Sequence, residues 1–131
     1  MQTINKIVVH CSDSPHRGDT AADVHRWHVG RGWSGIGYHY TIDENGHVEH
    51  GRPHYWTGAH VSGHNTGSLG IMLFGIDYFT PVQLHALKEL IEGLLLTYPE
   101  ATVCGHRDLD ARKSCPNFDV KEWWARVKNA N

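Results

Sequence analysis

Residues 103–116 read VCGHRDLDARKSCP and place a histidine, a lysine and a cysteine within ten residues of one another. Residues 101–104 form a short β-prone run, so His106 is expected just after the end of a strand, where α/β sheets usually present their site residues. Residues 107–112 carry four charges without an apolar period. We therefore predict that a loop, and not a helix, follows this strand.

The side chains in this stretch are of the kinds that bind zinc. Pro116 favours an extended backbone at Cys115, so Lys113 and Cys115 are expected to point the same way. An imidazole and a thiolate are two typical zinc ligands, and a site with three protein ligands keeps a fourth position for water. A third ligand is therefore needed beside His106 and Cys115. His10 is the best candidate, because it ends the other strongly apolar run of the chain.

The composition is that of a globular protein, and its 131 residues fit one domain that needs no disulfide. A net charge of −2 gives no electrostatic footprint for nucleic acid or for an anionic membrane. The three cysteines leave at least one unpaired and form no Cys-x-x-Cys motif, which suits a reducing compartment. The polar start and the short apolar run after it predict neither a signal peptide nor a membrane span.

Strands and helices are expected to alternate along the chain, which predicts a single α/β (α+β-like) domain over residues 1–131. A hairpin is expected around Asn45-Gly46, and Thr80, Pro81 and Gln83 form the start signal of a long helix. The glycine-rich segment 52–67 is expected to be irregular and outside the core. The expected strands are 6–11, 38–42, 46–50, 69–76 and 101–104, and the expected helices are about 20–30, 80–98 and 119–127.

Five short motifs occur in order along the chain: Val8–Ser12, Gly37–Tyr40, Gly58–His60, Asn65–Ser68 before Gly70-Ile71, and Gly105–Asp108 before Lys113–Pro116. Together they resemble the zinc-dependent N-acetylmuramoyl-L-alanine amidases of type two. That group includes the phage lysozymes of the amidase kind and the peptidoglycan recognition proteins. The resemblance runs from about residue 6 to residue 125, which is nearly the whole chain.

The resemblance implies a ligand set and two catalytic residues. It implies that His10, His106 and Cys115 hold one Zn²⁺ and that Tyr38 and Lys113 assist catalysis. Cytosolic amidases that recycle wall fragments typically have aspartate as the third ligand, so the cysteine makes the chain similar to the phage lysozymes. The resemblance also implies a mixed central β-sheet flanked by helices.

A groove over the metal, which would take the glycan strand and the stem peptide, is implied as well. His60 falls where members of the family line that groove, so it is expected to bind substrate. Two neutral imidazoles and one thiolate would leave the zinc site with a net charge of about +1, enough to bring bound water to a pKa near 7. Lys113 is expected to stabilise the oxyanion of the amide under attack. Whether Tyr38 donates to that oxygen or orients the water is left open.

The leading hypothesis is a phage endolysin that hydrolyses the amide between N-acetylmuramic acid and L-alanine in peptidoglycan. It would be a monomeric catalytic domain without a wall-anchoring module, made in the host cytoplasm, with no stable membrane insertion, and acting on the wall after membrane disruption. Three alternatives stay open: a cytosolic amidase that recycles muropeptides, a glycosidase that uses paired carboxylates such as Glu49 with Asp108, and a module that binds peptidoglycan or a partner protein without cutting.

Overall fold

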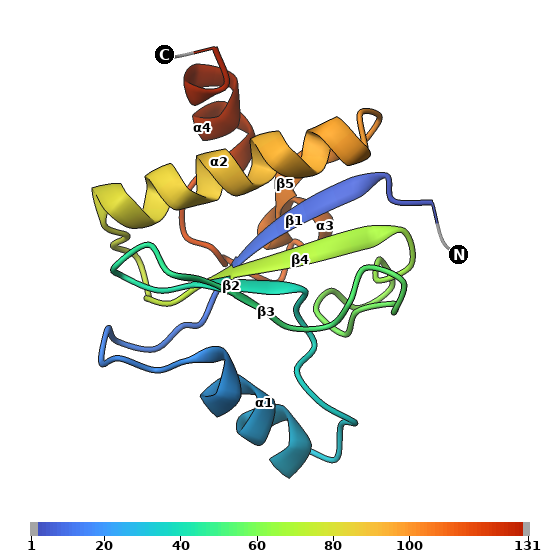
Figure 1. The fold of residues 1–131 in the computed structure, drawn as a ribbon, viewed down its shortest axis with the longest axis vertical. Coiled ribbons are helices and arrows are strands. Elements are labelled where there is room, and N and C mark those ends of the chain that lie inside the picture. Colours follow the sequence, from blue (N-terminus) through green and yellow to red (C-terminus); the bar gives the residue numbers. More distant parts are fainter. Residues whose placement is uncertain (1–2, 130–131) are drawn as a thin grey trace.

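The computed structural model describes residues 3–129 and has a five-stranded sheet at its centre (Figure 1). The strand order is β3-β2-β4-β1-β5. Strands β1, β2, β4 and β5 are paired in parallel, and β3 is antiparallel to β2, so the mixed sheet expected from the sequence is confirmed. The strands are β1 Lys6–Cys11, β2 Tyr40–Ile42, β3 Val48–His50, β4 Ser68–Leu73 and β5 Thr102–Gly105.

Helices cover both faces of this sheet. In Figure 1, α2 and α4 lie on one side and α1 lies on the other. The capping box predicted for the long helix is present, since Thr80 Oγ1 accepts from the Gln83 N–H at 3.1 Å and Gln83 Oε1 accepts from the Thr80 N–H at 3.1 Å. Within residues 3–129, none of the helices combines the length and the apolar character needed to cross a membrane. The helices are α1 Ala21–Gly30, α2 Pro81–Thr97, α3 His106–Leu109 and α4 Val120–Val127.

The alternation of side chains along β1 divides the core into two parts and positions the site. Ile7 and Val9 are fully buried against the α2 side, where they join Leu87 of that helix. Because successive side chains of a strand point to opposite faces, His10 faces the α1 side of the sheet. There a smaller cluster holds Val24 of α1 with Met72 of β4. The apolar face of β1 thus anchors the strand while its other face carries a potential ligand.

Two expectations from the sequence were wrong. The segment after β5 begins with a short helical turn, α3, because the Asp108 carboxylate accepts a hydrogen bond from the Gly105 N–H at 2.8 Å and one turn needs no apolar face. The segment 52–67 is irregular, but it does reach the core. Val61 is 1% exposed, and Asn65 Oδ1 accepts from the N–H groups of both His60 and Val61 at 2.8 Å, which satisfies the backbone buried there.

Candidate metal centre and active site

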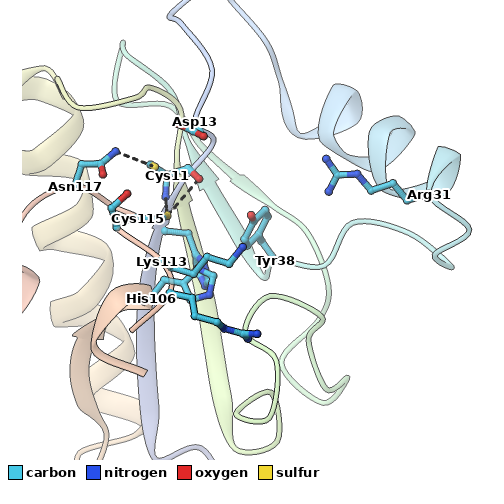
Figure 2. Close-up of a pocket in the computed structure, with 11 residues that line it drawn as sticks. Cys11, Asp13, Arg31, Tyr38, His106, Lys113, Cys115 and Asn117 are labelled. Atoms are coloured by element: carbon cyan, nitrogen blue, oxygen red, sulfur yellow. Dashed lines mark hydrogen bonds between the residues drawn. The ribbon is translucent and has the colours of Figure 1, made fainter. Parts of the chain in front are cut away.

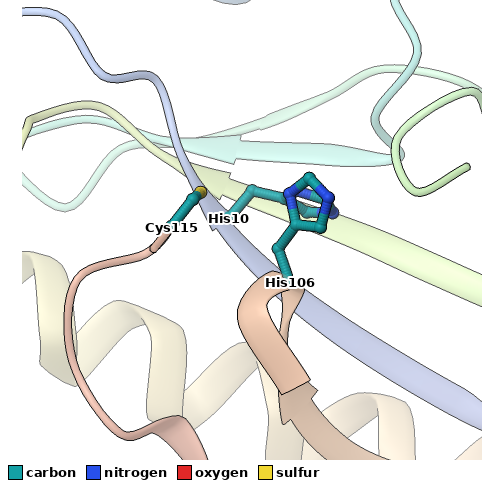
Figure 3. Close-up of side chains that lie close together, drawn as sticks. All are labelled: His10, His106 and Cys115. Atoms are coloured by element: carbon teal, nitrogen blue, oxygen red, sulfur yellow. The ribbon is translucent and has the colours of Figure 1, made fainter. Parts of the chain in front are cut away.

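Three potential ligands converge at the carboxyl end of β1. His10 lies in β1, His106 begins α3 just after β5, and Cys115 lies in the loop before α4 (Figure 3). Their ligand atoms all lie within 4.8 Å of one another, and the Nδ1 atoms of the two histidines are 3.1 Å apart. The structure therefore brings together the three residues that the sequence suggested as ligands.

Sheet pairing explains why residues so distant in the sequence meet. Strands β1 and β5 are parallel neighbours with Val9 opposite Gly105, so the residues that follow, His10 within β1 and His106 just after β5, lie side by side. Cys115 then connects its own loop to α3 and to β1 through two hydrogen bonds. The Arg107 N–H donates to the Cys115 carbonyl at 2.9 Å, and the N–H of the residue after His10 donates to the Cys115 sulfur at 2.8 Å.

Burial keeps both imidazoles neutral, which is the form that binds metal. The pKa of His10 is lowered by its burial and further by His60 and His106. The pKa of His106 is lowered by burial and by the nearby Lys113 ammonium. The pKa of the Cys115 thiol is raised, because it is hydrogen-bonded to the Cys11 thiol and buried.

Taken together, these groups fit a zinc ion. Two neutral imidazoles and one sulfur, held close together, form a donor set that Zn²⁺ prefers. A coordinated thiol loses its proton outright, so a bound cation would reverse the raised pKa of Cys115. The N–H donor at 2.8 Å is already placed to stabilise the resulting thiolate. The site can therefore hold a metal with three protein ligands and leave room for water.

An open cavity of about 380 Å³ lies over the three ligands and is also lined by Arg31, Tyr38 and Lys113. Figure 2 shows Tyr38, Lys113 and His106 lying together, with Arg31 pointing toward them from the end of α1. A second cavity of about 410 Å³ shares these four residues and extends past Trp33. The two together form a groove over the candidate metal site.

The two predicted catalytic residues both lie at this groove. The Tyr38 ring stacks at an angle on His10, with ring centroids 5.1 Å apart. Its pKa is raised by burial and by the neighbouring Cys115 and Cys11, so its hydroxyl remains a hydrogen-bond donor. Lys113 lines both cavities, and within residues 3–129 no carboxylate lies within ion-pair distance of its ammonium. It therefore brings an uncompensated positive charge to the groove.

His60, which the resemblance places in the substrate groove, lies in the wall of the second cavity but is 8% exposed. Both of its ring nitrogens are engaged. Nδ1 is 2.8 Å from His10 Nε2, and Nε2 is 3.1 Å from Ser68 Oγ. Burial lowers the pKa of His60 to about 3, so it is neutral. Ser68 lies in one of the motifs quoted above, but no role could be predicted for it from the sequence.

The carboxylates of the glycosidase alternative are used elsewhere. Glu49 Oε1 accepts from the Ala21 N–H at 3.0 Å at the start of α1, and Asp108 caps α3 through Gly105. Neither carboxylate lines either cavity of the groove. The groove is lined by the His-His-Cys cluster, a tyrosine and a lysine, together with Asp13 and with Asp110, which forms an ion pair with Arg112. By fold and site this is a candidate metallohydrolase.

Comparison with known proteins agrees with this class. Residues 1–118 match the family described as N-acetylmuramoyl-L-alanine amidase. The chain is 39% identical to the endolysin of Klebsiella phage KP32 and 37% identical to that of Escherichia phage T7, in both cases over 95% of this chain and 88% of the relative. The amidase LysC from Clostridium intestinale URNW, 33% identical, has a TM-score of 0.87 and matches over 96% of this chain and 86% of its own.

The chain therefore belongs to the N-acetylmuramoyl-L-alanine amidase family. This confirms the resemblance seen in the sequence, the fold class and the assignment as an enzyme that hydrolyses peptidoglycan. The chain is similar to these phage endolysins over nearly its whole length.

Proposed function

We propose that this amidase is a zinc-dependent endolysin. It would hydrolyse the amide that joins the lactyl group of N-acetylmuramic acid to L-alanine and so degrade the host wall at lysis. The observation that carries the zinc dependence is the convergence of His10, His106 and Cys115, whose ligand atoms lie within 4.8 Å of one another beneath an open groove. These three residues would hold one Zn²⁺.

The remaining residues of the groove have separate tasks in this proposal. When bound, the zinc ion supplies a water of pKa near 7 and an electrophile for the amide carbonyl. Lys113 donates to the carbonyl oxygen as negative charge grows on it during attack. Tyr38, kept protonated by burial, donates a second hydrogen bond, either to that oxygen or to the water. The Cys115 thiolate that forms on metal binding accepts a hydrogen bond from the Cys11 N–H group, which points at its sulfur.

The similarity to endolysins supports a proposal for the setting of the reaction. The chain is proposed to be a monomeric catalytic domain that is made in the host cytoplasm and meets the wall after another protein has opened the membrane. Its ligand is peptidoglycan, with the glycan strand and the stem peptide lying in the groove. His60 contributes to the wall of that groove.

The test is to digest purified sacculi and to measure new amino groups and new reducing ends in parallel. The proposal predicts amino groups only, and their complete loss after treatment with a chelator, with recovery on adding Zn²⁺. New reducing ends would indicate a glycosidase. Binding to sacculi without any release would indicate a recognition module, and cleavage of soluble muropeptides but not of sacculi would indicate a recycling amidase.

A further inference from the structure

A chain of hydrogen bonds leads away from the candidate metal site into the protein. His10 turns Nδ1 toward His106 at 3.1 Å and Nε2 toward His60 Nδ1 at 2.8 Å. His60 Nε2 is 3.1 Å from Ser68 Oγ. The Ser68 hydroxyl in turn donates to the backbone carbonyls of His64 at 2.8 Å and Asn65 at 3.0 Å.

The backbone carbonyls at the end of this series of hydrogen bonds determine which atom donates in each of the others. A backbone carbonyl only accepts, so the Ser68 hydroxyl uses its hydrogen there and its oxygen accepts from His60 Nε2. A neutral imidazole with its proton on Nε2 has a lone pair on Nδ1. His60 Nδ1 therefore accepts from His10 Nε2. With its own proton on Nε2, His10 is left with a lone pair on Nδ1, the nitrogen that faces His106.

Two glycines and one asparagine around His60 fix the position of its ring. A Cβ at Gly70 would lie 2.6 Å from His60 Cγ, and one at Gly58 would lie 2.5 Å from His60 Cδ2, so only glycine at these positions leaves room for the ring. Asn65 Oδ1 holds the backbone N–H groups of His60 and Val61 from the other side. The imidazole is thus held in one orientation, with both nitrogens aimed at partners.

We infer that His60 is a positioning residue that, together with Ser68, holds His10 in the tautomer and ring orientation that present Nδ1 to the metal. The inference rests on the zinc site proposed above. Partners of this kind to metal-binding histidines typically change metal affinity 10–100-fold when they are removed. The partner here is a neutral imidazole in place of a carboxylate, so it orients His10 and leaves the charge of the site unchanged.

The test compares zinc affinity, by competition with a chromophoric chelator, among the full-length wild type and three variants. His60→Leu removes the acceptor and is expected to weaken zinc binding 10–100-fold. His60→Asn keeps an acceptor at the position of Nδ1 and is expected to retain most of the affinity. His64→Leu, the same change four residues further along the same segment, is the matched control and is expected to bind like the wild type.

A second readout separates positioning from a purely structural role. Nitrogen NMR of the zinc-loaded wild type is expected to show the His10 proton on Nε2, and it needs no variant to fold. Thermal unfolding without metal shows whether each variant is folded. Wild-type affinity in folded His60→Leu, or a His10 proton on Nδ1, would overturn the inference and leave the proposed function standing. A wild type that takes up no zinc would overturn both.

Discussion

Replacing Lys113 by alanine tests the catalytic part of the proposal. Lys113 lines both cavities of the groove, and within the described part of the chain its ammonium has no carboxylate partner. Its full charge is therefore available to the oxyanion. Its neighbour Arg112 also lines the groove, but its Nε and Nη2 atoms each lie 3.0 Å from an oxygen of the Asp110 carboxylate. Much of the Arg112 charge is already compensated.

The size of the effect follows from what a single oxyanion donor contributes. Deleting one such donor in other hydrolases costs about 10²–10³ in kcat, or about 2.7–4 kcal/mol of transition-state stabilisation. We expect this loss for Lys113→Ala, measured as amino groups released from purified sacculi. Zinc content is expected to stay at the wild-type level, because Lys113 is not a ligand in the proposed site.

Arg112→Ala is the matched control, since it removes a cation from the adjacent position in the same groove. We expect kcat of Arg112→Ala to fall by less than about tenfold, because Arg112 takes no part in the chemical step of the proposal. Equal losses of activity in the two variants, or a loss of zinc from Lys113→Ala along with its activity, would contradict a specific role of Lys113 at the oxyanion. The first result would mean that the groove needs only overall positive charge, and the second that the lysine supports the metal site.

Three further predictions concern stability and the rejected alternative. His28 Nδ1 accepts from the Gly37 N–H at 2.9 Å, and burial lowers the pKa of His28 to about 4. Below pH 6.5 the unfolded chain therefore binds a proton at His28 more readily than the folded chain does, and this residue alone lowers the stability by up to about 3 kcal/mol by pH 4. In urea unfolding of the metal-free protein, His28→Asn should lose less stability between pH 7 and pH 4 than the wild type, and equal losses would contradict this account. Leu87 is fully buried on α2, and Leu87→Ala should lower the free energy of unfolding by about 2–5 kcal/mol. The folded variant should still bind zinc. Glu49→Gln and Asp108→Asn should each leave amide hydrolysis near the wild-type rate, whereas a loss of 10² or more in both would revive paired carboxylate catalysis.

Much of the fold could be predicted from local patterns. The apolar run ending at His10 and the start signal at Thr80 predicted elements that the structure contains, because buried central strands and helix caps have strong local signatures. The short helix α3 was missed, since a single turn held by Asp108 needs no apolar period. The burial of Val61 was also missed, because it depends on one side-chain amide that satisfies two backbone N–H groups.

The site was predicted less evenly. His10, His106 and Cys115 could be proposed as ligands from residue type and from the ends of expected strands, and the parallel pairing of β1 with β5 explains why they meet. The contact of His60 with His10 could not be predicted, because it depends on how the segment 52–67 folds back over the sheet. The role of Ser68 could not be predicted for the same reason, since it depends on the contact of its hydroxyl with the His60 ring.

In the proposed function three side chains hold one zinc ion that the reaction requires, and the metal content per chain tests this requirement. Wild-type protein and the Cys115→Ala and Cys11→Ala variants would be purified side by side, and their zinc would be counted by mass spectrometry. We predict one zinc per chain in the wild type and in Cys11→Ala, whose backbone N–H remains to face the ligand sulfur. We predict almost none in Cys115→Ala, together with loss of amine release. A zinc-free wild type that still releases amino groups from peptidoglycan would contradict the account.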